Sequence, residues 1–223
     1  MPQSFKYHTM MNINRREVCR YMSCRGIPED KAVLALVDEV EKELLACISP
    51  KNVYREFSLS IEENEITIGQ NMKVVSSGLA KNLYGCEKVV LFAATLGTQA
   101  DYLLRKYEIG NISKAAAAQA VGAAAIEAYC DELNEKIRQS YENEFFLKPR
   151  FSPGYGDFAL EHQKDFFRLL EITKKTGITL SSSLLMIPTK SVTAVIGLTK
   201  SRSGCNTVKC ASCKQSDCEF RNL

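Results

Sequence analysis

The chain has 223 residues and a formal net charge of +3 at pH 7, with 45% hydrophobic and 25% charged residues. This composition is typical of a folded globular protein with a sizeable core, and it excludes wholesale disorder. The small net charge argues against a nucleic-acid partner. No apolar run approaches the roughly 20 residues needed to cross a bilayer, so we expect no membrane partner. Nine cysteines and the absence of tryptophan are the unusual counts.

The cysteines fall into two groups, five scattered through the first 130 residues and four gathered between Cys205 and Cys218. An odd total does not fit the disulfide framework of a secreted protein. The N-terminal segment also lacks the apolar stretch of a secretory signal. We therefore expect a reducing, cytoplasmic setting, in which the scattered thiols pack as small apolar side chains.

Apolar spacing predicts the elements of the first half of the chain in order. The expected helices and strands are a helix over 14–24, a helix over 29–47, strands over 53–61 and 66–68, a helix over 72–83, a buried strand over 88–95 and a helix over 98–107.

The longest helical signal covers residues 112–140, with Ser113 as the expected N-cap. The small side chains of 115–118 and of Gly122 fit tight helix packing or the close approach of a ligand. Polar residues at helical spacing form a stripe that is either a solvated face or the wall of a cleft. The members of this stripe are Glu127, Asp131 and Asn134.

After Lys148 we expect an amphipathic helix over 160–170, and then strands over 178–185 and 191–198 joined by a turn at Pro188. The order of elements favours an α+β fold, with a mixed or antiparallel sheet flanked by helices and a long helix before a ligand loop. We expect one domain over 1–200, which includes the N-terminal helices of residues 1–50, and a Cys-rich tail over 201–223.

The segment 150–157 carries the densest chemistry of any loop in the chain. Flanking prolines restrict its backbone, while Gly154 and Gly156 permit positive φ and expose backbone groups. Arg150 offers a planar fork for a carboxylate, and Tyr155 adds an aromatic face with a polar tip. Such a loop suits a zwitterionic or nucleoside-like small molecule, although the same pattern also fits a plain turn.

Several motifs in one order give this loop a wider context. Arg150-x-x-x-Gly154-Tyr155 is followed by a Gln-Lys-x-x-Phe-x-Leu-Leu helix over 163–170, then by Gly177-Ile178 and by Met186-Ile187-Pro188. The helix from Ile126 to Arg138 precedes them. Together these motifs resemble the activation (reactivation) domain of cobalamin-dependent methionine synthase, over roughly residues 85–200.

The resemblance implies a binding site for S-adenosylmethionine. It assigns ligand contact to Arg150 and Tyr155, with Tyr155 close to the corrin, and backbone contact to the intervening Ser152, Pro153 and Gly154. An acidic position on the preceding helix of the family matches Glu127. The serines around Ser182 stand where the family has a polar strand near the ligand, although a carboxylate is expected there.

In that family, oxidised cobalamin is repaired by reductive methylation with S-adenosylmethionine as the methyl donor. The cofactors supply the hard chemistry, so the protein mainly positions them. The chain is too short for a whole synthase and lacks the cobalamin-binding motif. The resemblance therefore implies a separate reactivation subunit, a methyltransferase component of methionine biosynthesis that is active only on a cobalamin-binding partner. Its loop and its 181–190 turn would face the corrin, and a flavodoxin or ferredoxin would supply the electron.

The C-terminal cysteines lie outside the resemblance. Cys205, Cys210, Cys213 and Cys218 are separated by four, two and four residues. Such a cluster predicts a zinc or iron–sulfur site, while a thiol-rich tail or a redox-active pair at Cys210 and Cys213 are the alternatives. One competing hypothesis is a redox activator of a corrinoid protein that works through this cluster. A second, a zinc-tailed interaction module that touches nucleic acid, is disfavoured by the low net charge.

Overall fold

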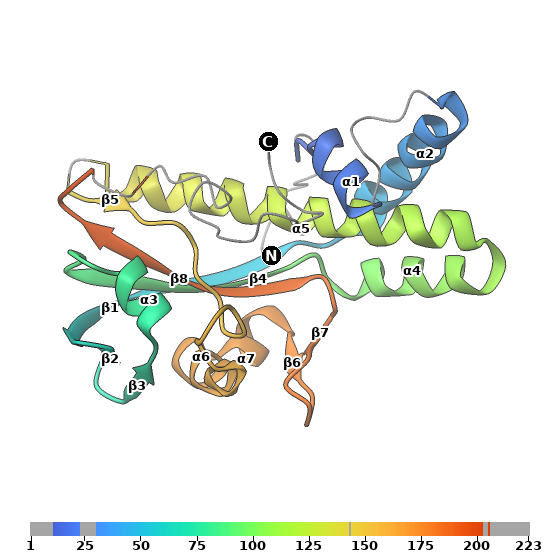
Figure 1. Cartoon of the computed structure of the whole chain (residues 1–223). Helices are drawn as coiled ribbons and strands as arrows, with labels where there is room; N and C mark the ends of the chain where they lie inside the picture. The colour runs from blue at the N-terminus through green and yellow to red at the C-terminus, as the bar shows by residue number, and fades with distance from the viewer. Residues whose placement is uncertain (1–10, 23–29, 143, 203–204, 206–223) are drawn as a thin grey trace, which may run out of the picture.

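The computed structural model describes residues 11–22, 30–142, 144–202 and 205 (Figure 1). The helices are α1 (Arg15–Tyr21), α2 (Lys31–Cys47), α3 (Ser77–Asn82), α4 (Thr98–Gly110), α5 (Ile112–Ser140), α6 (Gln163–Leu170) and α7 (Ile172–Thr176), with a 3-10 turn at Leu160–His162. The strands are β1 (Lys51–Glu62), β2 (Glu65–Ile68), β3 (Met72–Val75), β4 (Lys88–Thr95), β5 (Phe146–Leu147), β6 (Thr179–Leu180), β7 (Met186–Ile187) and β8 (Ser191–Thr199).

The centre of the molecule is a six-stranded antiparallel sheet in the order β3-β2-β1-β4-β8-β5. β4 lies inside it and pairs along its whole length with β1 on one side and β8 on the other. Its side chains are almost all buried because both faces of this strand are covered. A run without polar alternation is the sequence pattern of such a strand. The α+β fold with helices flanking an antiparallel sheet is thus confirmed.

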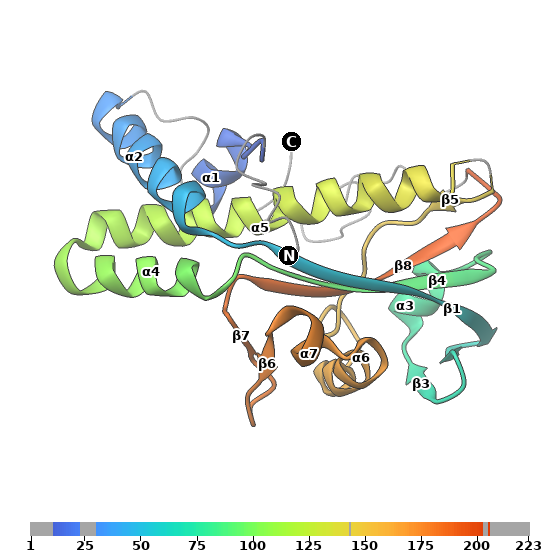
Figure 2. The same ribbon diagram turned by 180° about the vertical axis from the view of Figure 1, so that it is seen from behind.

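The pleat of β4 divides its side chains between two cores. Val90, Phe92 and Ala94 face the layer formed by α1, α2, α4 and α5. The alternate residues Val89, Leu91 and Ala93 pack with α3, α6, α7 and the β2–β3 ribbon. Figure 2 shows these two layers from behind, with the long α5 above the sheet and α6 and α7 below it. The N-terminal helices pack into the same core as α5.

The longest helix lies where its pattern predicts it, over Ile112–Ser140, and it buries the expected apolar stripe. Its cap differs from the prediction, because the Oδ1 of Asn111, not Ser113, accepts the Lys114 N–H at 3.0 Å. The small residues serve close packing. A Cβ on Gly122 would lie 2.9 Å from the Lys190 side chain, which crosses the helix at that point.

Two of the predicted elements are wrong in part. Residues 72–75 form strand β3 rather than the first turn of a helix, because β2 offers them a ladder partner. The C-terminal strands do not pair with each other, since 179–180 pairs with 186–187 in a separate hairpin while β8 joins the large sheet. The turn of this hairpin lies at 181–185, and the expected turn at Pro188 is instead the passage from the hairpin into the sheet.

Most of the scattered cysteines pack as expected. Cys19 and Cys130 are buried, while Cys47 and Cys86 are partly buried. Cys24 lies outside the described residues, as do Cys210, Cys213 and Cys218 of the tail. Among the described residues, no helix combines the length and the apolar character that crossing a bilayer requires.

Candidate functional site

The strand edge of β8 positions the loop at 150–157. After β5 the chain continues along β8, with the Lys148 N–H donating to Gly197 at 2.8 Å and the Phe151 N–H donating to Val195 at 3.0 Å. Phe151 packs on the side of the sheet that α6 and α7 cover. Because side chains alternate along an extended chain, the preceding Arg150 faces α5. Figure 1 shows this connection crossing β8 on its way to α6.

Arg150 forms two ion pairs with α5. Its Nη2 donates to Glu127 Oε2 and its Nη1 lies beside Asp131 Oδ1, both at 2.8 Å. The carboxylates can share one guanidinium because residues four apart lie on the same helix face. The Arg150 side chain is only 8% exposed, whereas those of Glu127 and Asp131 are 36% and 72% exposed. Buried charge of this kind requires such partners.

Both ends of the Arg150 fork face carboxylates of the chain. Nη2 is hydrogen-bonded to Glu127, while the buried Nη1 is ion-paired with Asp131 without a hydrogen bond. With Arg150, Glu127 and Asp131 ionised, the cluster carries one net negative charge and presents its carboxylates at the surface. We call these three residues the Arg150 cluster. Two members of the polar stripe expected on α5, Glu127 and Asp131, thus meet Arg150 in one charged cluster.

Tyr21 at the end of α1 is a second neighbour that sequence reasoning missed. Burial, together with the nearby negative charge of Glu127, raises the pKa of the Tyr21 phenol. Tyr155 also acts on it electrostatically. The cation of Arg20 stacks over the Tyr21 ring, 4.9 Å from its centroid. No local pattern could have shown this proximity, because it depends on how α1 docks on α5.

Two glycines determine the backbone conformation of the loop beyond Arg150. Gly154 and Gly156 have φ of +89° and +56°, the left-handed conformations that their sequence positions predicted. The Gly154 N–H donates to Phe158 at 2.7 Å and the Tyr155 N–H to Ser152 at 3.1 Å. These bonds fold a tight turn that leaves Tyr155 67% exposed. Its ring contacts Phe151 edge-on, with 6.2 Å between centroids.

At its far end the loop is fixed by Asp157, to which the sequence assigned no role. The carboxylate accepts hydrogen bonds from the Oγ atoms of Ser76 and Ser77 and from the N–H groups of Ser77 and Gly78. These donors hold the pKa of Asp157 well below its usual range, with the Ser76 hydroxyl as the largest cause. The start of α3, some 80 residues earlier in the chain, thereby anchors the loop.

In the structure Glu127 contacts Arg150 directly. The other residues that the resemblance assigns to the site make no such polar contact with Arg150 within the described part of the chain. Ser152 is half-buried and Pro153 is buried at the base of the loop. Ser182 lies exposed in the turn of the β6–β7 hairpin, where the hydrogen bonds of Ser181 stay within the turn. A strand position for Ser182 is therefore wrong.

The structure describes too few of the tail cysteines to show whether they form a metal site. Cys205 alone of the four is described; its Sγ donates to the Ser201 carbonyl at 3.4 Å, and burial raises the pKa of its thiol. Cys210, Cys213 and Cys218 lie outside the described part of the chain. In that part, no group of three or more His, Cys, Asp and Glu side chains is arranged to hold a metal ion.

A known structure has a fold similar to that of this chain. The structure is similar to one described as the crystal structure of the MetH reactivation domain bound to AdoHcy, with a TM-score of 0.66 over 89% of this chain and 76% of that chain. Sequence identity is 18%, so this likeness concerns the fold. No curated protein sequence matches the chain.

The class is therefore a reactivation-domain fold. A family model described as the vitamin B12 dependent methionine synthase activation domain matches residues 79–219. The chain belongs to this family.

Proposed function

We propose that this protein binds S-adenosylmethionine at the Arg150 cluster and supports reductive methylation of a cobalamin held by a methionine synthase core protein. The observation that carries the proposal is the buried Arg150, held by Glu127 and Asp131 beside an exposed glycine-tyrosine turn. Family membership and the AdoHcy of the structurally similar domain support it.

The charge of the site fits this ligand. S-adenosylmethionine carries a sulfonium, an ammonium and a carboxylate, and hence one net positive charge. The Arg150 cluster carries one net negative charge, and its carboxylates are partly exposed. Opposite charges near a protein surface attract by on the order of a few kcal/mol at contact distance. We infer that Glu127 and Asp131 face the cationic end of the ligand, while Arg150 holds both carboxylates in place.

The turn after Arg150 supplies the other contacts. Gly154 brings its backbone close to a ligand without a side chain in the way, and we assign backbone contacts to Ser152 and Pro153 as well. Tyr155, exposed at the tip, would lie between this ligand and the corrin. The methyl donor and the cofactor carry the reactivity when both are bound, so the residues of the chain orient the ligand and keep water away.

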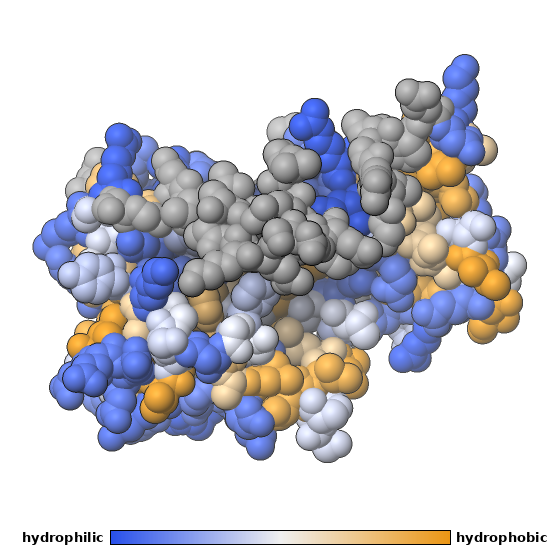
Figure 3. Space-filling view, in the orientation of Figure 1, coloured by the Kyte–Doolittle hydropathy of each residue, from blue (hydrophilic) through white to orange (hydrophobic). Residues whose placement is uncertain are grey.

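We propose that the β6–β7 hairpin extends the docking face toward the cobalamin protein. Leu185 and Ile187 are 64% and 48% exposed, although large apolar side chains usually avoid water. Figure 3 shows apolar side chains gathered at the lower edge of the molecule, over this hairpin. Ser182 lies in its turn and would meet the partner rather than form the floor of the ligand site.

A flavodoxin or ferredoxin as electron donor and a cytoplasmic location are parts of the same proposal.

A methyl-transfer assay tests the whole function. An oxidised cobalamin-binding protein without an activation domain is mixed with a chemical reductant, S-adenosylmethionine labelled on its methyl group, and this chain. We expect label on the cobalamin only when the chain is present. The Arg150→Ala variant should lose this activity, and Arg138→Ala, which also removes an arginine paired with two carboxylates, should keep it. Transfer that is independent of the chain would contradict the proposal.

Metal binding by the tail is a separate proposal that its spacing supports. Cys205, Cys210, Cys213 and Cys218 supply four thiolates, which suits zinc or an iron–sulfur cluster. Metal analysis and visible absorption of anaerobically purified protein would distinguish these two. A quadruple Cys→Ser variant should lose the metal while retaining S-adenosylmethionine binding. The loss of both would show that the metal-bound tail supports the ligand site.

A further inference from the structure

The ligand loop is attached to the protein at two points by different means. At its start, Arg150 is paired to α5 and the neighbouring backbone is bonded to β8. At its end, beside the buried Phe158, the Asp157 side chain bonds the loop to the start of α3. Asp157 accepts from Ser76 Oγ at 2.5 Å, from Ser77 N–H and Oγ at 2.7 Å each, and from Gly78 N–H at 3.1 Å.

The receiving segment is shaped for this carboxylate. A Cβ on Gly78 would lie 2.9 Å from Asp157 Oδ1 and 3.3 Å from the Phe151 ring, so a larger residue would push the loop away. Ser76 also uses its Oγ to accept the Leu79 N–H at 3.0 Å, which keeps that hydroxyl oriented. Ionised acceptors make the stronger hydrogen bonds, and here both oxygens of one carboxylate are used.

Between the two attachments the tip of the turn is held by its own backbone hydrogen bonds and buries no side chain. Gly154, Tyr155 and Gly156 are exposed, and the Tyr155 ring contacts Phe151 only at an edge. The two glycines give this stretch backbone freedom that other residues lack. Fixing such a segment before binding removes an ordering cost that the ligand would otherwise bear.

We propose that Asp157 is a positioning residue for the ligand loop: by clamping the loop to the start of α3 it presets the Gly154–Tyr155 turn for ligand binding. This inference rests on the proposed function, since the turn is the part assigned to S-adenosylmethionine. Asp157 acts through the turn and is not assigned a ligand contact.

The first test compares affinity for S-adenosylmethionine by isothermal titration of the full chain. Asp157→Ala should raise the Kd about tenfold or more, on the scale of lost hydrogen bonds to a charged group. Asp157→Asn, which keeps one acceptor oxygen, should recover part of the affinity. The matched control is Asp30→Ala, because Asp30 also caps a helix, accepting from Ala32 N–H at 2.7 Å, but at the start of α2. It should bind like the unaltered chain.

The second test needs no ligand and uses the absence of tryptophan from the chain. Tyr155→Trp places a single indole in the turn. The fluorescence anisotropy of this indole should fall, and its quenching by acrylamide should rise, when Asp157→Ala is added. Adding Asp30→Ala should change neither signal.

The two tests separate the failures. If the unaltered chain does not bind S-adenosylmethionine, the proposed function is wrong, and the indole fluorescence alone decides on the clamp. If the chain binds it and Asp157→Ala binds equally well, the positioning role is overturned. Unchanged anisotropy and quenching of the indole overturn it as well. Should Asp157→Ala fail to fold, Asp157→Asn gives the same comparison with a milder change.

Discussion

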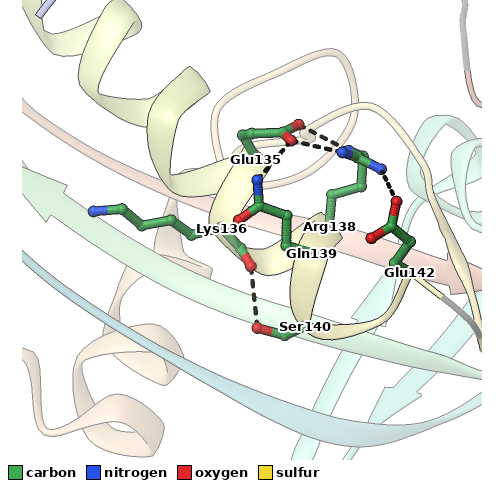
Figure 4. A network of polar contacts seen from close by, with 6 residues as sticks. All are labelled: Glu135, Lys136, Arg138, Gln139, Ser140 and Glu142. Carbon is green, nitrogen blue, oxygen red and sulfur yellow. Dashed lines mark hydrogen bonds and ion pairs between the residues drawn. The ribbon is translucent and has the colours of Figure 1, made fainter. Parts of the chain in front are cut away.

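Two clusters along helix α5 have the same composition, each an arginine between two carboxylates. Arg138 pairs with Glu135 at 2.6 Å and with Glu142 at 3.6 Å, and Figure 4 shows this group at the end of the helix. The Arg150 cluster has the same charges. Arg138 is 47% exposed and its partners are three and four residues away, whereas Arg150 is 8% exposed and its partners come from another element.

The difference teaches what distinguishes a candidate site from a surface ion pair. Exposed local pairs lose little water and contribute little to stability. The Arg150 cluster joins a loop to a helix position 23 residues earlier in the chain, and its arginine has lost most of its water. Such a cluster fixes tertiary structure, because it ties the loop to α5. Composition alone does not separate the two cases.

The largest expected contrast between the clusters is in stability. Arg150→Met keeps most of the buried volume but leaves Glu127 and Asp131 facing each other without a cation. We expect the free energy of unfolding to fall by about 2 kcal/mol, the scale of lost hydrogen bonds to charged groups. Urea denaturation measures this loss. Arg138→Met should leave the curve unchanged, and an equal loss in both variants would remove the distinction.

The second largest expected contrast between the two clusters is in their effect on ligand affinity. Neutralising one carboxylate with Glu127→Gln should weaken binding of S-adenosylmethionine roughly tenfold, the scale of one charge interaction in a partly solvated site. S-adenosylhomocysteine, which lacks the sulfonium charge, should lose less. Glu135→Gln, the matched change in the Arg138 cluster, should affect neither ligand. Titration calorimetry with both ligands checks these ratios. An equal loss for the two ligands would contradict an interaction of Glu127 with the sulfonium, the charge that S-adenosylhomocysteine lacks.

A pH series tests the other attachment of the loop. The pKa of Asp157 lies below its ordinary value of 3.8, so the folded protein keeps this carboxylate ionised in conditions where the unfolded chain protonates it. Its contribution to stability is therefore complete at neutral pH and is lost as the pH falls below that ordinary value toward the lowered one. The melting temperature of Asp157→Asn should lie below that of the unaltered chain by a constant amount from pH 7 to about 5 and converge with it below about pH 4. A gap that widens with acid would contradict the clamp.

The smallest expected effect concerns salt. In 1 M NaCl the Debye length is about 3 Å, so exposed pairs are screened more strongly than buried ones. Double-mutant cycles on Arg138 with Glu135 should lose their coupling energy in salt. Cycles on Arg150 with Glu127 should keep most of theirs. Equal salt sensitivity of the two cycles would show that the Arg150 cluster is as solvated as its counterpart.

Long elements with a clear apolar pattern were predictable from the sequence, and the short strands β3, β6 and β7 were not. The helix over 112–140 and the buried strand over 88–95 lie where their patterns predict them. Residues 72–75 pair with β2 and contain two strand-favouring valines, but four residues are too few for their period to separate a strand from the start of a helix. The hairpin at 179–187 was missed because two apolar runs do not reveal which partner each will find.

The site divides in the same way. Arg150 and Gly154 stood out through residue type and spacing, and Glu127 came with the family resemblance. Asp131 is part of the polar stripe expected on α5, whereas Tyr21 comes near Glu127 only because α1 packs on α5. Asp157 follows the motif directly, yet its importance lies in donors about 80 residues away. Such long-range polar contacts leave no periodic trace in a sequence.

The most direct test of the central proposal is a titration of the purified chain with S-adenosylmethionine, repeated with Arg150→Ala and Arg138→Ala. We predict saturable one-to-one binding by the unaltered chain and by Arg138→Ala, and an affinity at least about tenfold lower for Arg150→Ala. Absence of binding by the unaltered chain, or equal affinity in all three proteins, would contradict the assignment of this site.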